Sequence, residues 1–194
     1  MEGEVTRLSG LADRDHLTGL YNRRSFEHRL AMEWRRSARH SSHLTLALVD
    51  VDHFKAFNDS YGHLAGDHAL RGVAGRLNSL TGRAGDSVFR IGGEEFALIL
   101  PDTDQAGAAV IGGRICGGIR GENVAMGDDE ERFLTVSFGS CSALITEREM
   151  PSMLLSYADQ ALYKAKRTGR NRAVCIARKT FFDQRETVNT FALG

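Results

Sequence analysis

The sequence has little cysteine and proline and no long hydrophobic run. Its 194 residues include 3 cysteines and 2 prolines. Cys116, Cys141 and Cys175 are odd in number, widely spaced and outside any CxxC pattern, which argues against a disulfide framework and a structural zinc site. No apolar run approaches the roughly 18 residues of a membrane span, and MEGEVTRLSG at the start is unlike a signal peptide. We therefore expect a cytoplasmic chain without direct membrane insertion, alone or as the cytoplasmic part of a membrane-anchored protein.

The sequence also lacks an excess of charge of either sign. Lys plus Arg number 25, Asp plus Glu number 25, and the formal net charge is zero. Proteins that coat nucleic acid or lie on an anionic membrane are normally basic, so neither class is expected. With 42% hydrophobic and 26% charged residues the composition is that of an ordinary globular protein. The length fits one domain of roughly 150–200 residues.

Hydrophobic periodicity predicts alternating helices and strands. Phe26, Leu30 and Trp34 recur every four positions and indicate an amphipathic helix, whereas the apolar run 43–51 is typical of a buried strand. The order predicts an α+β fold, with a mixed or antiparallel central sheet flanked by helices on a ferredoxin-like βαββαβ core. The predicted elements are helix 22–39, strand 43–51, short helical material broken at Gly62, helix 64–80, hairpin strands 87–91 and 95–100, helix 104–120, strand 133–143, helix 151–166 and strand 173–176.

The two ends of the chain are expected to lie outside this domain. Residues 1–14 are polar, but Leu8, Leu11 and Ala12 have helical spacing, which predicts an incoming helix or linker, or else a frayed terminus. Residues 178–194 show no clear periodicity and are predicted to form a C-terminal tail. The domain itself is expected over residues 15–177.

Glycines mark two of the predicted elements. Gly92 and Gly93 at the tip of the hairpin are expected to supply the positive φ of a tight turn. Four glycines lie in the second half of predicted helix 104–120, and each costs about 1 kcal/mol in a helix interior. They are Gly112, Gly113, Gly117 and Gly118.

Four acidic residues lie at turns beside the predicted strands. Asp50 and Asp52 end strand 43–51, and Glu94 and Glu95 follow the two glycines of the hairpin. If these strands are neighbours, the carboxylates converge on one edge of the sheet. Their hard oxygen atoms suit Mg²⁺ or Mn²⁺ that holds substrate phosphates. The alternative is that Glu94 and Glu95 form a solvated acidic turn.

A basic segment has the opposite character. Residues 164–179 include seven basic residues and no acid. Lys166 and Arg170 lie four positions apart, so on a helix end they would point the same way and could grip a polyphosphate. The alternative is a solvated helix end whose charge complements the helix dipole. No aromatic residues interleave with the charges, which argues against a nucleic-acid partner.

Five segments, in order along the chain, resemble one protein family. RIGGEEF at 90–96 is similar to the GGDEF or GGEEF signature of diguanylate cyclases. The resemblance covers roughly residues 10–176, and it implies the nucleotidyl-cyclase-like fold of that family over 15–177. The other four segments are DHLTGLYNRRSF at 15–26, DVDHFKAFNDSYGHLAGD at 50–67, TVSFGS at 135–140 and ADQALYKAKRTGRNR at 158–172.

The resemblance implies a metal site and a catalytic hairpin. Asp50, the carbonyl of Val51 and the carboxylate of Glu94 would hold two Mg²⁺ or Mn²⁺ ions in each active site. Glu94 would also help to deprotonate the attacking 3′-hydroxyl, and Glu95 would be its companion acid. The family most often has Asp where this chain has Glu94, and active members of both kinds are implied. Gly92 and Gly93 would let the backbone approach the phosphates.

The resemblance also implies contacts to GTP. Asn58 and Asp67 would read the edge of the guanine, and Lys55 would stabilise charge on the transferring phosphoryl group. His63 matches a further substrate-contacting position, with a capping or packing histidine as the alternative. Lys166 and Arg170 would grip the phosphates. For Asp52 we expect a structural or supporting role rather than direct ligation.

A last segment matches the family's inhibitory site for its product. Arg83 and Asp86 form RAGD at the position of the family's RxxD site, where Arg and Asp would bind cyclic di-GMP with help from Arg90. The alternative is an ordinary pair of charges in a surface loop.

The resemblance implies condensation of two GTP into 3′,5′-linked cyclic di-GMP, with release of two pyrophosphates. Because the product is two-fold symmetric, we expect a homodimer with two chains facing each other, controlled by an upstream sensor domain or partner. One alternative is a catalytically silent receptor for cyclic di-GMP or GTP, although the catalytic positions are all present. Another is a cyclase that makes a 3′,5′-cyclic monophosphate from one nucleotide.

Overall fold

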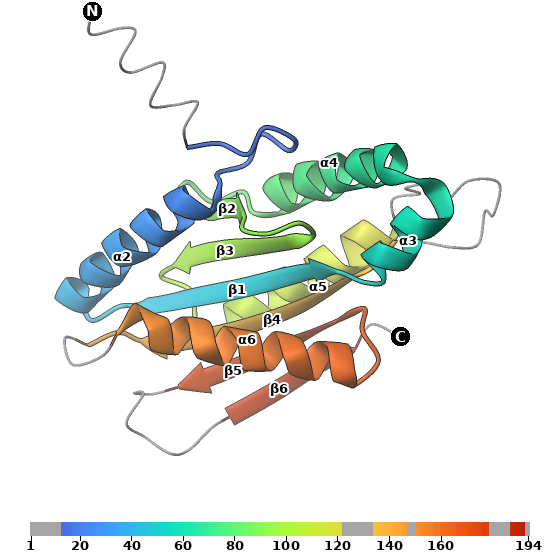
Figure 1. Ribbon diagram of the computed structural model, residues 1–194. Helices are drawn as coiled ribbons and strands as arrows, with labels where there is room; N and C mark the ends of the chain where they lie inside the picture. The colour runs from blue at the N-terminus through green and yellow to red at the C-terminus, as the bar shows by residue number, and fades with distance from the viewer. Residues whose placement is uncertain (1–12, 122–133, 147–149, 179–186, 193–194) are drawn as a thin grey trace, which may run out of the picture.

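A central sheet organises the molecule, with helices on both faces (Figure 1). The computed structural model describes residues 13–121, 134–146, 150–178 and 187–192. The elements are α2 (Arg23–His40), β1 (His43–Val51), α3 (Phe54–Tyr61), α4 (His63–Leu80), β2 (Ser87–Arg90), β3 (Glu95–Pro101), α5 (Gln105–Gly121), β4 (Val136–Leu144), α6 (Pro151–Arg167), β5 (Arg172–Arg178) and β6 (Thr187–Ala192).

The sheet has the order β2-β3-β1-β4-β5-β6, and β1 lies at its centre. The β4–β5 pair is parallel and the other pairs are antiparallel. The predicted α+β class with a mixed sheet and flanking helices is therefore confirmed. The predicted helix around Leu8, Leu11 and Ala12 lies outside the described residues.

The sheet carries one hydrophobic core on each face. Along β1, Leu44, Leu46 and Leu48 belong to the core under α2 and α6, whereas Val49 and Val51 belong to the core under α3, α4 and α5. This follows from the two-residue period of a strand, and it explains why the run 43–51 is apolar almost throughout. Figure 1 shows α6 across one face and α5 behind the other.

Two glycines allow helices to approach the sheet closely. A β-carbon at position 112 would come within 2.7 Å of the β-carbon of Ala173 and 2.8 Å of the Phe138 ring, so glycine lets α5 lie directly on β4 and β5. A β-carbon at position 139 would overlap the backbone of Leu162 in α6. At Gly112, close packing outweighs the low helix propensity of glycine.

Two local predictions were wrong. Neither Gly92 nor Gly93 has a positive φ; among the described glycines, those that do are Gly19, Gly62 and Gly169. Strand β4 begins at Val136, later than in the predicted strand 133–143. Strand β6 lies in segment 178–194, for which a tail was expected, and it pairs with β5 to form the edge of the sheet. Edge pairing uses backbone groups, so it requires no hydrophobic period in the sequence.

The three cysteines are free and buried. Burial raises the pKa of Cys116 to about 12 and the pKa of Cys175 to about 11, so these two thiols stay protonated at neutral pH. Among the described helices, none is both long and apolar enough to cross a bilayer.

Candidate active site

The acidic residues of two neighbouring strands meet at the end of β1. Asp50 lies opposite Glu95 in the β1–β3 register, and the Val51 N–H donates to the carbonyl of Glu94 at 3.3 Å. Residues opposite each other in an antiparallel pair share a face, so Asp50 and Glu95 both lie on the face covered by α2 and α6. The two strands are neighbours in the sheet, and their pairing brings Asp50, Glu94 and Glu95 to the same end of it.

The carboxylates of this cluster are held where negative charge is unfavourable. Burial raises the pKa of Asp50, although the hydrogen bond and charge of Lys166 oppose the rise. Burial also raises the pKa of Glu94, and the charge of Asp50 adds to the increase. The Lys166 ammonium lies 2.8 Å from Oδ2 of Asp50. The site therefore favours additional positive charge.

The donor atoms at this position fit a hard divalent cation carried with a substrate. Asp50 and Glu94 offer carboxylate oxygens, and Val51 offers a main-chain carbonyl. Among the residues that the structure describes, no group of three or more Asp, Glu, His or Cys converges into a complete ligand cage. Mg²⁺ commonly takes one or two carboxylates and completes its shell with water and phosphate oxygens. The residues present thus suit Mg²⁺ or Mn²⁺ bound together with a polyphosphate.

Asp52 ties three parts of the chain together. Its carboxylate accepts from the hydroxyl groups of Thr135 and Ser137 at 2.7 Å each, and from the Asn171 N–H at 3.0 Å. These bonds join the end of β1 to the start of β4 and to the turn between α6 and β5. Both carboxylate oxygens are engaged, which fits the structural role expected for Asp52.

The turn after α6 places the second basic residue differently from the prediction. Helix α6 ends at Arg167, so Lys166 and Arg170 do not share a helix face. Gly169 has φ +121°, Arg170 has φ +60°, and the Arg170 N–H donates to the Ala165 carbonyl, as in a Schellman motif. The charge of Arg170 still lowers the pKa of Asp50, so the Lys166 and Arg170 side chains both favour the ionised carboxylate.

Helices α3 and α4 carry four residues that are expected to contact GTP, among them Asn58 and Asp67, which are expected to bind guanine. Lys55 is exposed on α3, and His63 is exposed at the start of α4. Oδ1 of Asn58 is buried and has no hydrogen-bond partner in the described part of the chain. The Asn58 side chain packs directly against Gly66, the neighbour of Asp67 in α4. An orphaned acceptor of this kind is costly unless a ligand satisfies it.

Arg90 links the hairpin tip to the loop before α2. Its guanidinium donates to the carbonyl of Gly93 at 2.7 and 3.1 Å and to Oδ1 of Asp15 at 2.9 Å. The Arg90 and Asp15 side chains are 13% and 16% exposed. These bonds engage three of the five guanidinium N–H donors, so the product contact expected for Arg90 stays a prediction.

Sequence reasoning missed the segment that holds Arg90. Asp15 also accepts from the backbone and hydroxyl of Thr18, and the Arg90 N–H donates to the carbonyl of Tyr21. The Tyr21 ring in turn lies 4.4 Å below the guanidinium of Arg29. The loop before α2 is thus bonded to the β2–β3 hairpin. The sequence match of DHLTGLYNRRSF to the family indicated that this segment matters, but it did not indicate that Asp15 pairs with Arg90.

Removal of the Asp15 carboxylate is expected to weaken this link in a pH-dependent way. Burial raises the pKa of Asp15, but hydrogen bonds from Thr18 and Arg90 lower it more, so the folded value lies below the ordinary 3.8. Its stabilisation is therefore present above pH 3.8 and is lost as the pH falls through the folded pKa. We expect Asp15→Asn to lower the free energy of unfolding by about 1 kcal/mol at pH 7.

Urea unfolding at several pH values checks this prediction, with Asp59→Asn, an exposed acid of α3, as the control. The gap between wild type and Asp15→Asn should narrow as the pH falls below 3.8. A gap that stayed constant over this range would contradict a contribution from ionised Asp15.

The RAGD segment immediately precedes β2, so it lies at the opposite end of that strand from the tip of the β2–β3 hairpin. The Asp86 N–H donates to the carbonyl of Arg83 at 3.0 Å, which closes a turn. Burial raises the pKa of Asp86, and the Arg83 charge partly offsets this. Arg83 is exposed. Four strand residues separate this turn from the hairpin tip, about 13 Å at the rise of a strand. An anion bound here would not occupy the Asp50 cluster.

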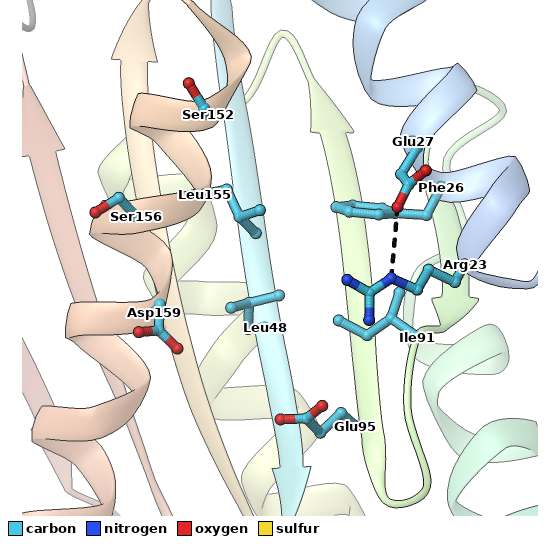
Figure 2. Close-up of a pocket in the computed structure, with 10 residues that line it drawn as sticks. All are labelled: Arg23, Phe26, Glu27, Leu48, Ile91, Glu95, Ser152, Leu155, Ser156 and Asp159. Atoms are coloured by element: carbon cyan, nitrogen blue, oxygen red, sulfur yellow. Dashed lines mark hydrogen bonds and ion pairs between the residues drawn. The ribbon is translucent and has the colours of Figure 1, made fainter.

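A hollow of about 440 Å³ adjoins the cluster between α2 and α6 (Figure 2). Its floor is apolar, and Glu95 lies at one end. The Arg23 and Glu27 side chains pair across 3.4 Å at the rim. The lining residues are Arg23, Phe26, Glu27, Leu48, Ile91, Glu95, Ser152, Leu155, Ser156 and Asp159.

Comparison with known proteins agrees with the resemblance. The family model described as "Diguanylate cyclase, GGDEF domain" matches residues 12–172. The chain is 37% identical over 171 residues to the probable diguanylate cyclase DgcC of Escherichia coli K12, covering 88% of this chain and 45% of the relative. This chain therefore spans about half the length of that relative.

Solved structures show the same fold. The coiled coil and GGDEF domain of DgcB from Caulobacter crescentus, in complex with c-di-GMP, superimposes with a TM-score of 0.82 at 30% identity, covering 90% of this chain and 91% of that one. The active GGEEF domain of a diguanylate cyclase from Vibrio cholerae has a TM-score of 0.73 at 29% identity, covering 83% and 99%. This chain belongs to the diguanylate cyclase GGDEF domain family.

Proposed function

We propose that the chain condenses two GTP molecules into 3′,5′-linked cyclic di-GMP and releases two pyrophosphates. The observation that carries the proposal is the cluster at the end of β1, where buried Asp50 lies beside Glu94 and its charge is compensated by Lys166 at 2.8 Å. Such a site binds a polyphosphate with its cation and holds carboxylates at the reacting atoms. Relatives named as diguanylate cyclases support the same activity.

Guanine is recognised at α3 and α4 in this proposal. The orphaned Oδ1 of Asn58 and the carboxylate of Asp67 are acceptors, which match the ring N–H and exocyclic amine of guanine. Adenine has no donor at the corresponding ring nitrogen, so the same site rejects ATP. His63, exposed beside Asp67 at the start of α4, supplies a further contact to the substrate.

The phosphates lie between the acidic cluster and the basic side chains. Mg²⁺ or Mn²⁺, two per active site and held by Asp50, the carbonyl of Val51 and Glu94, would supply neutralising charge for the triphosphate. Lys55, Lys166 and Arg170 stabilise the negative charge on the phosphoryl oxygens.

Glu94 and Glu95 act at the attacking group. Glu94 accepts the proton of the 3′-hydroxyl, a task that suits a carboxylate whose pKa is raised by burial and by Asp50. Glu95 is the companion acid. Gly92 and Gly93 keep side chains out of the path of the phosphates, and open space lies where a β-carbon of Gly93 would be.

The symmetry of the product requires two copies of the site. Each GTP supplies one 3′-hydroxyl and one α-phosphate, so two chains facing each other form an isologous homodimer around two substrates. An upstream sensor domain or partner that brings two chains together would control this encounter. We place the reaction in the cytoplasm, which holds the GTP.

Arg83 and Asp86 are proposed to bind the product as an inhibitory site. We expect Arg83→Ala to weaken cyclic di-GMP binding by about 10- to 100-fold, because a charged donor to phosphate or guanine is lost. Isothermal titration measures the affinity, and Arg24→Ala on the exposed side of α2 is the control. Equal affinities of wild type and Arg83→Ala would remove the site from the proposal.

Product analysis tests the proposed reaction. Incubation with GTP and Mg²⁺ should yield cyclic di-GMP, identified by mass, and ATP should yield no corresponding product. Formation of 3′,5′-cyclic GMP would indicate the one-nucleotide cyclase instead. Binding of cyclic di-GMP without synthesis would indicate the silent receptor.

A further inference from the structure

One ion pair lies where the proposed metal would bind. Nζ of Lys166 is 2.8 Å from Oδ2 of Asp50. The Asp50 side chain is 9% exposed, whereas the Lys166 side chain is 33% exposed and comes from the last turn of α6. Lys166 is therefore a counter-ion of the Asp50 carboxylate.

This arrangement places the ammonium in competition with a divalent cation. A cation that takes Oδ2 of Asp50 as a ligand would displace Nζ, because two positive groups at this oxygen would repel each other. A displaced lysine retains a flexible four-carbon stem, so its charge can move to a nearby phosphate at little cost. Asp50 has far less freedom, because it is fixed in the central strand between β3 and β4.

We infer that Lys166 is an exchangeable counter-ion that disfavours binding of a bare divalent cation and moves to the triphosphate when cation and nucleotide arrive together. The cation and the phosphates then bind as one unit, with positive cooperativity between them. The phosphate half of this inference rests on the proposed function, whereas the metal half rests on the Asp50–Lys166 contact alone.

The inference predicts opposite effects of one substitution on two ligands. Lys166→Met keeps the length of the side chain and removes its charge. Without nucleotide, Mn²⁺ should bind this variant about tenfold more tightly than wild type, as measured by the loss of the free Mn²⁺ signal in electron paramagnetic resonance. The Mg²⁺ complex of guanosine 5′-(α,β-methylene)triphosphate, which resists cleavage at the reacting bond, should bind about tenfold more weakly.

Two further variants make the comparison specific. Lys164→Met removes the same charge from an exposed position in the same helical turn, and it should leave both affinities within about twofold of wild type. Lys166→Gln repeats the test with a polar side chain, in case the methionine variant folds poorly. A merely structural role for Lys166 would weaken both ligands together.

The outcomes separate this inference from the proposed function. Mn²⁺ affinity that is unchanged or reduced in both Lys166 variants would overturn the inference. A wild-type chain that binds Mn²⁺ but not the nucleotide analogue would contradict the proposed function, and the Mn²⁺ comparison would still decide whether Lys166 opposes the bare cation.

Discussion

Replacement of Glu94 by glutamine is expected to lower the rate of cyclic di-GMP formation by at least about 100-fold. Glutamine has nearly the same shape, but it carries no charge for a divalent cation and accepts no proton from a hydroxyl. Glu94 lies at the hairpin tip and not in either hydrophobic core, so the fold should be preserved. Initial rates at saturating GTP and Mg²⁺ measure the effect.

A matched control separates loss of the site from loss of charge. Glu33→Gln removes an acid from α2 whose recorded partner is Arg36, so its rate should stay within about twofold of wild type. Synthesis by Glu94→Gln at the wild-type rate would exclude Glu94 from the chemistry.

Replacement of Gly139 by alanine is expected to destabilise the fold by about 3 kcal/mol or more. A β-carbon at this position would overlap the backbone of Leu162 and lie 2.7 Å from the carbonyl carbon of Ala161. Backbone atoms in a packed helix have no rotamer by which to move away. Helix α6 would have to shift from the sheet, and Lys166 would shift with it. Urea unfolding measures the change in free energy.

The control for this prediction is another glycine-to-alanine change. A β-carbon at Gly113, in the interior of α5, meets nothing within 4 Å. Gly113→Ala should therefore raise the free energy of unfolding by about 0.5–1 kcal/mol, because alanine has the higher helix propensity. If both variants were equally stable, the close approach of α6 to β4 would not be a constraint on the fold.

Elements with a strong hydrophobic period were predictable from the sequence. The run 43–51 coincides with β1, and Phe26, Leu30 and Trp34 all lie in the core under α2. Such elements form where one face or both faces are buried, and the spacing of apolar residues in the sequence shows directly which faces these are. Strand β6 was not predictable in this way, because it adds to the edge of the sheet through backbone hydrogen bonds.

Within the candidate site, proximity along strands was predictable and side-chain pairing was not. The convergence of Asp50 with Glu94 and Glu95 follows from the hairpin and the pairing of its strand with β1. The Asp15–Arg90 pair joins residues 75 positions apart and depends on how the loop before α2 folds. The turn at Arg170 likewise depends on its backbone conformation, since its φ of +60° lies outside the helical region.

Although the net charge of the chain is zero, acidic and basic side chains are separated in space within the candidate site. Acids lie at the end of β1 and at the hairpin tip, and Lys166 reaches them from the end of α6. A site for a metal and a triphosphate requires both signs in separate places. The balance of charge over the whole chain is thus compatible with strong local fields of each sign.

Synthesis as a function of protein concentration tests the central claim most directly. With GTP and Mg²⁺ in excess, two pyrophosphates should be released for each cyclic di-GMP formed, and the rate per chain should rise with protein concentration because two chains must meet. Absence of cyclic di-GMP at high protein concentration would contradict the claim that this site condenses two GTP molecules.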